Sequence, residues 1–256
     1  MIKICVPYNE TICKETQLSI DACVNAGIAE VEYAKGTYIN TAREYLISKD
    51  ADCHIRPTID KRYSHFLLVD SDMQFSIDDV LRLKDHRKSI VSAAYKTHDD
   101  KTWVCGYFDG FRIKFISVGE EPKGLVALCW AGNGLMLIER EYFEKVSAPW
   151  FGYDTRYKDE KFSFIGEDII FCEKAKKHGY KIYVDFDTEV NHLNRGQQME
   201  QQQRNLDSEE LAITKHISRI YGDIRGLAGQ ITALKDENDS LKKELSSLKS
   251  TKKVSK

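Results

Sequence analysis

The sequence predicts an α/β protein with a Rossmann-like, mostly parallel central sheet flanked by helices, followed by a C-terminal helical coiled coil. Three observations predict it. Short apolar runs alternate with helical segments about three times in the first hundred residues, which is the pattern of a covered parallel sheet. The composition, with 42% hydrophobic and 11% aromatic residues, suits a sizeable core. Beyond residue 213, isoleucines and leucines recur at heptad spacing.

The N-terminal half contains the alternating elements. Ser76 is the expected N-cap of the third helix, because Asp78 and Asp79 follow in a first turn that favours negative charge. We expect the first strand to end at Pro7, because proline has no N–H for an internal ladder. The predicted strands cover residues 2–6, 29–33, 65–69 and 89–95, and the predicted helices cover residues 11–26, 38–49 and 77–83.

The second half departs from strict alternation. Residues 103–108 and 111–118 predict a β-hairpin, because Asp109-Gly110 between them is a favoured turn pair. Further strands are expected at residues 125–130, 135–138, 181–185 and 188–191, and further helices at residues 141–146 and 169–178.

Composition and charge exclude several classes of protein. The formal net charge of the 256-residue chain is −2, which gives no general attraction to nucleic acid or anionic lipid. The seven cysteines are scattered and never spaced as C-x-x-C, which argues against a disulfide framework and a zinc site. No apolar run reaches the length of a membrane span, and the N-terminus does not have the pattern of a signal peptide. We expect neither a membrane nor a nucleic-acid partner, and a cytoplasmic location in a bacterium or an infected host cell.

One acidic turn is the leading candidate for chemistry. Asp70-Ser71-Asp72 follows the apolar run 66–69 directly, at the carboxyl end of a predicted buried strand, where open α/β sheets bind their ligands. Carboxylate oxygens suit hard divalent cations, and a nucleotide diphosphate can complete such a coordination shell. Neither G-x-G-x-x-G nor a P-loop occurs in the sequence to bind the phosphates instead. The alternative is a polar turn whose residues cap the next helix.

Other polar residues each have two interpretations. Glu167 and Asp168 begin a predicted helix, where they act as caps or as a general base that removes a proton from an attacking hydroxyl. His192 follows the last predicted strand as a structural histidine or a third metal ligand. Arg43 is a surface arginine or a phosphate contact. Trp130 is a core residue or a stacking surface at a pocket mouth.

The C-terminal region predicts dimerisation. Beyond a domain of residues 1–195, residues 196–212 form a polar linker, residues 213–250 a coiled-coil helix and residues 251–256 a basic tail. Isoleucine at a with leucine at d favours a parallel two-stranded coil, and Asn238 at one a position adds register specificity. The alternative is an amphipathic helix that folds back on the core. The a positions are Ile217, Ile224, Ile231, Asn238 and Leu245, and the d positions are Ile220, Leu227, Leu234, Leu241 and Leu248.

Several segments taken together resemble a known family. They are IKICVPYNE, YINTAREYLIS, HFLLVDSDMQF, SIVSAAYKT, LCWAGNGLMLIEREYFEKV and GEDIIFCEKAKKHGYKIYVDFDTEVNHL. In this order they resemble the GT-A glycosyltransferases, and more closely the small family-2-like enzymes of bacteriophages and large DNA viruses. The resemblance covers residues 1–193 and implies the GT-A fold; it does not extend to the heptads.

The resemblance implies a role for each matching position. Asp70 and Asp72, with Ser71 between them, match the DXD motif that binds Mn²⁺ or Mg²⁺ against the donor diphosphate, and His192 matches a histidine that completes the metal shell. Asp168, in the matching Glu167-Asp168 pair, is then the base of an inverting enzyme. The remaining matches concern the donor: Pro7, Tyr8 and Asn9 line the base and ribose, Arg43 faces the donor, and Trp130, Gly132 and Asn133 lie at the sugar and acceptor pocket.

The function that follows is transfer of a sugar, from a UDP-sugar or another nucleotide sugar, to a hydroxyl of a glycan or protein by a homodimer. Two alternatives keep the metal site, namely sugar transfer to a modified DNA base and nucleotidyl transfer. The net charge disfavours the first, and the lack of a glycine-rich basic loop after residue 6 disfavours the second. A non-catalytic dimeric scaffold with a decayed transferase domain is a further alternative, which the intact acidic residues oppose.

Overall fold

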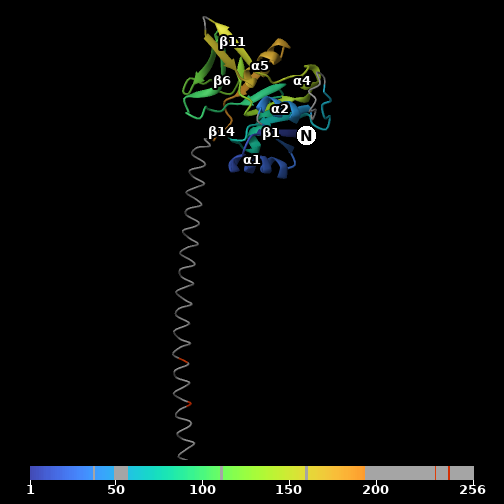
Figure 1. The fold of residues 1–256 in the computed structure, drawn as a ribbon, viewed down its shortest axis with the longest axis vertical. Helices are drawn as coiled ribbons and strands as arrows, with labels where there is room; N and C mark the ends of the chain where they lie inside the picture. Colours follow the sequence, from blue (N-terminus) through green and yellow to red (C-terminus); the bar gives the residue numbers. More distant parts are fainter. Residues whose placement is uncertain are drawn as a thin grey trace, which may run out of the picture. The chain divides into compact units, whose positions relative to one another are not determined.

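The computed structural model describes residues 1–36, 38–48, 57–109, 112–158 and 161–193, together with Leu234 and Lys242 (Figure 1). The predicted linker, coiled coil and basic tail lie outside the described residues except at these two positions. Both residues are helical, and the Leu234 side chain is 63% exposed. The domain boundaries and the coiled coil therefore stay predictions.

The central sheet has seven strands in the order β2-β1-β3-β10-β5-β13-β8. Five of them run parallel, as the alternation predicts, while β10 and β8 run antiparallel to their neighbours. The strand β10 lies between β3 and β5, an insertion that local sequence patterns do not reveal. The strand bounds are β1 Ile2–Tyr8, β2 Ala29–Lys35, β3 His65–Val69, β5 Ile90–Ala93, β8 Leu125–Leu128, β10 Leu135–Glu139 and β13 Ile182–Asp185.

Strand β1 continues through Pro7, so the prediction that it ends there is wrong. Pro7 pairs with Ala34 and Tyr8 pairs with Lys35 of β2. On the other side, the pairing of β1 with β3 stops at Cys5. Proline is tolerated because no ladder has to be maintained on that side of the strand. The extra residues carry the end of β1 toward the pocket described below.

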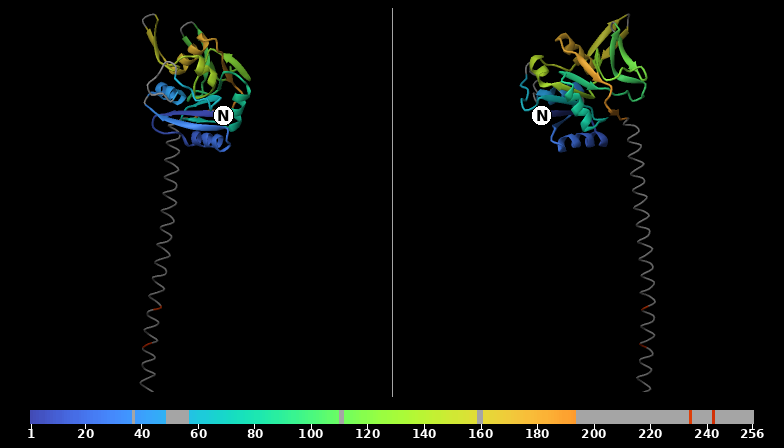
Figure 2. Two further views of the ribbon diagram at one scale, coloured as in Figure 1. Left: turned by 90° about the vertical axis from the view of Figure 1, so that its right-hand side faces the viewer. Right: turned by 180° about the vertical axis from the view of Figure 1, so that it is seen from behind.

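Helices cover both faces of this sheet (Figure 2). Side chains alternate along β3, so Phe66 and Leu68 pack in one apolar cluster and Leu67 and Val69 in the other. Residues of α2, α4 and α5 belong to the first cluster, and residues of α1 and α3 to the second. The fully buried strand predicted at residues 66–69 is thereby confirmed. The helix bounds are α1 Lys14–Asn25, α2 Ile39–Ser48, α3 Ile77–Asp85, α4 Arg140–Lys145 and α5 Glu167–Lys177.

The predicted cap of α3 is present. The Ser76 side chain accepts a hydrogen bond from the Asp79 backbone N–H, and the Asp79 carboxylate accepts one from the Ser76 backbone N–H. This reciprocal capping box fixes the start of the helix that follows the acidic turn.

Three smaller sheets complete the described part of the chain. The predicted hairpin is confirmed as β6 and β7, and β9 joins its edge in the order β7-β6-β9. The hairpin β11–β12 was not predicted. Of the strand predicted at residues 188–191, only Asn191 lies in a strand, β14, and the Glu189 N–H donates to the Asp79 carboxylate. The bounds are β4 Met73–Gln74, β6 Thr102–Asp109, β7 Arg112–Ser117, β9 Trp130–Ala131, β11 Asp154–Lys158, β12 Lys161–Ile165 and β14 Asn191–His192.

Within the described ranges, no helix combines the length and the apolar character needed to cross a membrane.

Candidate functional site

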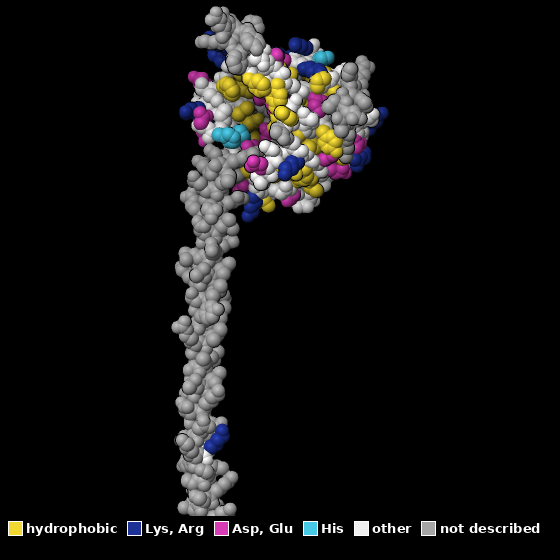
Figure 3. All heavy atoms as spheres, viewed as in Figure 1, with side chains coloured by type: hydrophobic (Ala, Val, Ile, Leu, Met, Phe, Trp, Pro, Cys, Tyr) yellow, Lys and Arg dark blue, Asp and Glu magenta, His cyan; other side chains and the backbone are white. Residues whose placement is uncertain are grey.

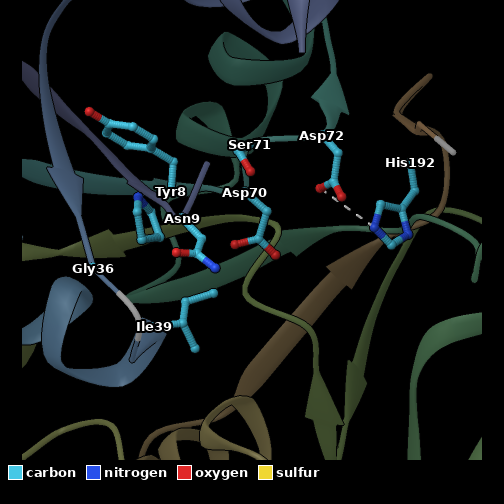
Figure 4. Close-up of a pocket in the computed structure, with 9 residues that line it drawn as sticks. Tyr8, Asn9, Gly36, Ile39, Asp70, Ser71, Asp72 and His192 are labelled. Carbon is cyan, nitrogen blue, oxygen red and sulfur yellow. Dashed lines mark ion pairs between the residues drawn. The ribbon is translucent and has the colours of Figure 1, made fainter. Parts of the chain in front are cut away.

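A pocket opens at the carboxyl ends of the parallel strands β1, β2 and β3 (Figure 4). Its volume of about 210 Å³ is smaller than the range that encloses a drug-sized ligand. A nucleotide-sized ligand would therefore extend beyond it. The lining residues are Pro7, Tyr8, Asn9, Gly36, Ile39, Asp70, Ser71, Asp72 and His192. Seven of the predicted site residues thus meet in this pocket.

The acidic turn is held by backbone contacts from three directions. The Ser71 carbonyl accepts hydrogen bonds from the Cys13 N–H at 2.8 Å and the Thr16 hydroxyl at 3.3 Å. The Asp70 N–H donates to the Gly134 carbonyl at 2.9 Å, and the Asp72 carbonyl accepts from the Leu193 N–H at 2.7 Å. The turn is therefore built into the fold from both ends of the domain.

Asp72, His98 and His192 form what we call the histidine cluster. One possible ligand atom from each residue lies within 4.8 Å of the other two. The Asp72 carboxylate lies 3.7 Å from His192 Nε2, and Figure 4 shows the two side chains turned toward each other. The rings of His98 and His192 stack with their centroids 3.8 Å apart. The geometry of this cluster could hold a divalent cation.

The orientation of His192 supports this assignment. Its Nδ1 lies 3.1 Å from the Lys96 carbonyl, which can only accept a hydrogen bond, so Nδ1 carries the proton. Nε2 is the ring nitrogen that faces the Asp72 carboxylate. A backbone carbonyl that fixes the ring in this way is the usual support of a metal-binding histidine. The short β4–β14 ladder, in which His192 pairs with Met73, brings the ring to the acidic turn.

His98 is not among the site residues predicted from the sequence. It lies in the turn that follows β5, another parallel strand whose carboxyl end faces the same edge of the sheet as Asp70. The acidic turn was predicted as a site because its polar side chains follow a buried strand. The same pattern is present at His98, which follows the predicted strand at residues 89–95.

A second group, the arginine cluster, consists of Arg43, Asp70, Glu167 and Asp168. The Arg43 side chain is 1% exposed, and its guanidinium donates to Asp70 at 2.5 Å and also to Glu167. Burial opposes the charge of Arg43, but the two carboxylates outweigh it and raise its pKa above the usual value. Arg43 thus binds two protein carboxylates and is not among the pocket-lining residues, although the resemblance implies that it faces the donor.

Asp168 differs from its neighbour Glu167. Glu167 is paired with Arg43, whereas the Asp168 Oδ1 atom accepts a hydrogen bond from the Ile169 backbone N–H at 2.7 Å. Burial raises the pKa of Asp168 to about 6, and the charge of Glu167 adds to the rise. A carboxylate with such a pKa can accept a proton near neutral pH, which suits a general base. Of the two predicted catalytic carboxylates, Asp168 is the better placed for that chemistry.

The Gly132-Asn133-Gly134 turn packs against a tyrosine. A Cβ atom at Gly132 or Gly134 would lie 2.1 Å or 2.7 Å from the Tyr95 hydroxyl, which accepts a hydrogen bond from the Gly134 N–H. The close approach that requires these glycines is therefore to Tyr95. Asn133 is 2% exposed, and neither its side-chain oxygen nor its side-chain nitrogen has a hydrogen-bond partner among the described residues. Such an unsatisfied pair is rare in a native interior and calls for a partner.

Trp130 belongs to the core. Its side chain is 1% exposed, and its ring packs edge-on against Phe115 with the centroids 4.9 Å apart. Of the two interpretations of Trp130, the structure places it in the core rather than at the mouth of the pocket described here.

Neither a protein-family model nor a curated protein matches this sequence. The fold is similar to that of A197 from STIV, with a TM-score of 0.50 and 18% sequence identity over 75% of this chain and 85% of that one. At this identity the similarity concerns the fold alone.

Two further solved structures match more weakly. GalNAc-T7, solved with UDP, GalNAc and Mn²⁺, is 10% identical with a TM-score of 0.46, over 76% of this chain and 44% of that one. The catalytic domain of Drosophila β1,4-galactosyltransferase 7, solved with xylobiose, is 11% identical with a TM-score of 0.45, over 76% of this chain and 71% of that one. The chain thus spans less than half of the GalNAc-T7 chain.

Proposed function

We propose that this protein is a metal-dependent glycosyltransferase that moves a sugar from a nucleotide-sugar donor to a hydroxyl of a glycan or protein, with inversion. The observation that carries the proposal is the placement of Asp70. This residue lines the pocket that also contains Asp72 and His192 of the histidine cluster, and its carboxylate pairs with Arg43 of the cluster that contains Asp168. In this proposal, the site for the leaving group and the base Asp168 lie on either side of Asp70, at the carboxyl end of β3.

The histidine cluster would hold the cation. One carboxylate and two imidazoles form a donor set that suits Mn²⁺ better than Mg²⁺, because Mg²⁺ prefers an octahedral shell of oxygen atoms. When bound, the ion would offset the negative charge that develops on the departing diphosphate. Asp70, of the sequence-predicted ligands, is engaged by Arg43 and would contribute to the donor contact more than to the metal shell.

The remaining pocket residues would bind the nucleotide. Tyr8 and Asn9 extend from the end of β1 and would contact the base and ribose of a UDP-sugar. The pocket is too small for the whole donor, so the sugar would lie outside it, beyond the acidic turn. The unpartnered amide of Asn133 is buried and does not line the pocket, so we assign it no contact with that sugar.

Asp168 would act on the acceptor. Its Oδ2 atom takes the proton of the acceptor hydroxyl while that oxygen forms a bond to the anomeric carbon. The bond from the anomeric carbon to the phosphate oxygen breaks, and the nucleoside diphosphate leaves with the electron pair. One base is sufficient for this single displacement with inversion.

The test is a panel of UDP-, GDP- and dTDP-sugars incubated with the full chain, with Mn²⁺, with Mg²⁺ and with a chelator. We expect nucleotide release from at least one donor with Mn²⁺, less with Mg²⁺ and none with the chelator. Equal release in the presence of the chelator would contradict the metal site. Failure of every donor to bind or react, with metal present, would contradict the transferase assignment.

We also propose that the heptads make the protein a parallel homodimer. The predicted a and d positions from Ile217 to Leu248 need a second chain to cover them. Sedimentation of the full chain should show a dimer, and Leu227→Asp with Leu241→Asp should give a monomer. An unchanged dimer in that double variant would place the interface elsewhere.

A further inference from the structure

Two aromatic rings are exposed together beside the base. Phe164 is 64% exposed and Tyr153 is 41% exposed, and their rings stack with centroids 5.1 Å apart and planes inclined by 29°. The pair Phe151 and Phe171 stacks with the same centroid distance, but these residues are 2% and 0% exposed. Core packing explains the pair of Phe151 and Phe171. It does not explain the pair of Tyr153 and Phe164, because their stacking covers only part of each ring and leaves the rest in water.

The exposed pair lies close to Asp168. Phe164 is on β12, and the chain passes from it through buried Ile165 and the helix N-cap Gly166 into Glu167 and Asp168. Tyr153 lies just before β11, where partial burial and then the charge of Glu167 raise the pKa of its hydroxyl. Asp168 adds to the same rise, so the phenol lies within electrostatic reach of both carboxylates.

The hairpin that carries the pair is fastened to α5. Arg156 on β11 donates to Glu173 on α5 at 2.5 Å. Thr155 pairs with Phe164 and Asp154 with Ile165, so both rings are carried by paired or flanking backbone. The rings are therefore held in a defined place relative to the helix that begins with the base. Figure 3 shows hydrophobic side chains spread between charged ones over the face of the domain in view.

We propose that Tyr153 and Phe164 form a stacking platform for the acceptor, and that the acceptor is a sugar ring. This inference rests on the proposed function and narrows its acceptor from a glycan or protein hydroxyl to a glycan. The apolar face of a pyranose presents C–H groups that pack against the negative face of an aromatic ring. A ring seated there directs its hydroxyl groups sideways, where Asp168 can take a proton from one of them.

The surrounding charges favour a neutral ring over a nucleobase in DNA, which would also stack. Asp154, Glu167 and Asp168 make the neighbourhood acidic, and Arg156 is already paired with Glu173 and Asp154. A phosphate backbone would be repelled by these carboxylates, whereas an uncharged sugar meets no such repulsion.

The test measures direct binding to the full chain by isothermal titration calorimetry. The probes are methyl glycosides of glucose, galactose, mannose and N-acetylglucosamine, in the presence of UDP and Mn²⁺. We expect at least one glycoside to bind the wild type, and Phe164→Ala to raise its dissociation constant about tenfold. Phe164→Trp and Tyr153→Phe keep the rings and should keep the affinity. Tyr107→Ala, which removes a 45% exposed tyrosine of β6, is the matched control and should change nothing.

Phe164→Leu distinguishes the contribution of the aromatic ring to binding from that of its apolar surface. It keeps the side chain apolar, so a loss of binding in Leu as well as Ala, with unchanged thermal unfolding, supports stacking. Equal affinity in the wild type and both variants would overturn the inference. Nucleotide-sugar cleavage by the wild type with transfer to serine or threonine peptides and no bound glycoside would overturn it while leaving the proposed function standing. If the wild type cleaves no nucleotide sugar, the proposed function fails and the inference fails with it.

Discussion

The histidine cluster and the arginine cluster lie on either side of the same strand end and solve opposite electrostatic problems. Arg43 is a permanent cation inside its own cluster, and it already compensates Asp70 and Glu167. In the histidine cluster, Asp72 faces the Nε2 atom of His192, and none of the three members is a lysine or an arginine. The arginine cluster already contains a cation that pairs with two of its carboxylates, while the histidine cluster gains most from an added cation. From this difference we infer that the arginine cluster positions its carboxylates and that the histidine cluster binds the ligand.

The largest effect should follow from removing the base. Asp168→Asn should lower the rate of transfer by about a thousandfold, within the range of general base catalysis, and leave UDP binding intact. Steady-state kinetics and calorimetry measure the two separately. Asp109→Asn, which changes an exposed carboxylate on β6, is the control. Transfer that survives in Asp168→Asn would move the base to another residue and remove the division of roles between the clusters.

The next largest effect is expected from Arg43→Met, which tests whether the ion pairs of the arginine cluster stabilise the fold. The variant leaves two carboxylates facing each other without a cation, so we expect a loss of about 3–5 kcal/mol in the free energy of unfolding. Urea denaturation measures it. The control is Arg62→Met, because Arg62 makes an ion pair with Asp60 at the surface, where removal should have no measurable effect. A loss as small as that of the control would mean that the buried pairs do not stabilise the fold.

A smaller effect is expected at the metal. His98→Ala removes one of the three proposed ligands and should weaken Mn²⁺ binding by at least the about 10- to 100-fold typical of outer-shell partners, as measured by electron paramagnetic resonance. His178→Ala, an exposed histidine at the end of α5, should leave the affinity unchanged. Unchanged Mn²⁺ affinity in His98→Ala would reduce the cluster to Asp72 and His192.

The pH dependence sharpens the role of Asp168. Because the base must be ionised and burial raises its pKa to about 6, kcat/KM should be level above that pH. It should fall about tenfold for each pH unit below it. A profile that stays level well below the pKa would exclude Asp168 as the base.

The same shift predicts a change in stability. A raised carboxylate pKa disfavours the folded state once the group is charged. The cost is absent when the pH lies below the unfolded pKa of 3.8, and it is fully present when the pH lies above the folded pKa of about 6. Asp168→Asn should therefore be more stable than the wild type at neutral pH, and the difference should shrink as the pH falls from 6 toward 4. Urea denaturation at several pH values follows the difference.

Much of the fold could be predicted because its signals are local. The apolar run 66–69 identified a strand that is covered on both faces, and Ser76 with Asp79 identified the start of a helix. The insertion of β10 between β3 and β5 could not be predicted, because it depends on which strands pair over long distances. The hairpin β11–β12 was missed for lack of a turn signal between its strands.

The candidate site was partly predictable, because some of its residues also follow local sequence signals. Asp70 and Asp72 were found because they follow a buried strand, but the engagement of Arg43 with Glu167 spans 124 positions in the sequence. Trp130 and the glycines around Asn133 were ambiguous, because a pattern that permits close packing does not say what is packed. Here the packed groups are the core and Tyr95.

The most direct test of the account is the dependence of UDP binding on Mn²⁺, measured by calorimetry for the wild type, Asp72→Asn and Asp78→Asn. Asp78 is a carboxylate in the first turn of α3, outside both clusters, and serves as the matched control. We predict that UDP binds the wild type and Asp78→Asn much more tightly with Mn²⁺ than without it, and that Asp72→Asn loses this enhancement. UDP binding that is equal with and without Mn²⁺, or an enhancement that survives in Asp72→Asn, would contradict the assignment of the histidine cluster as the metal–diphosphate site.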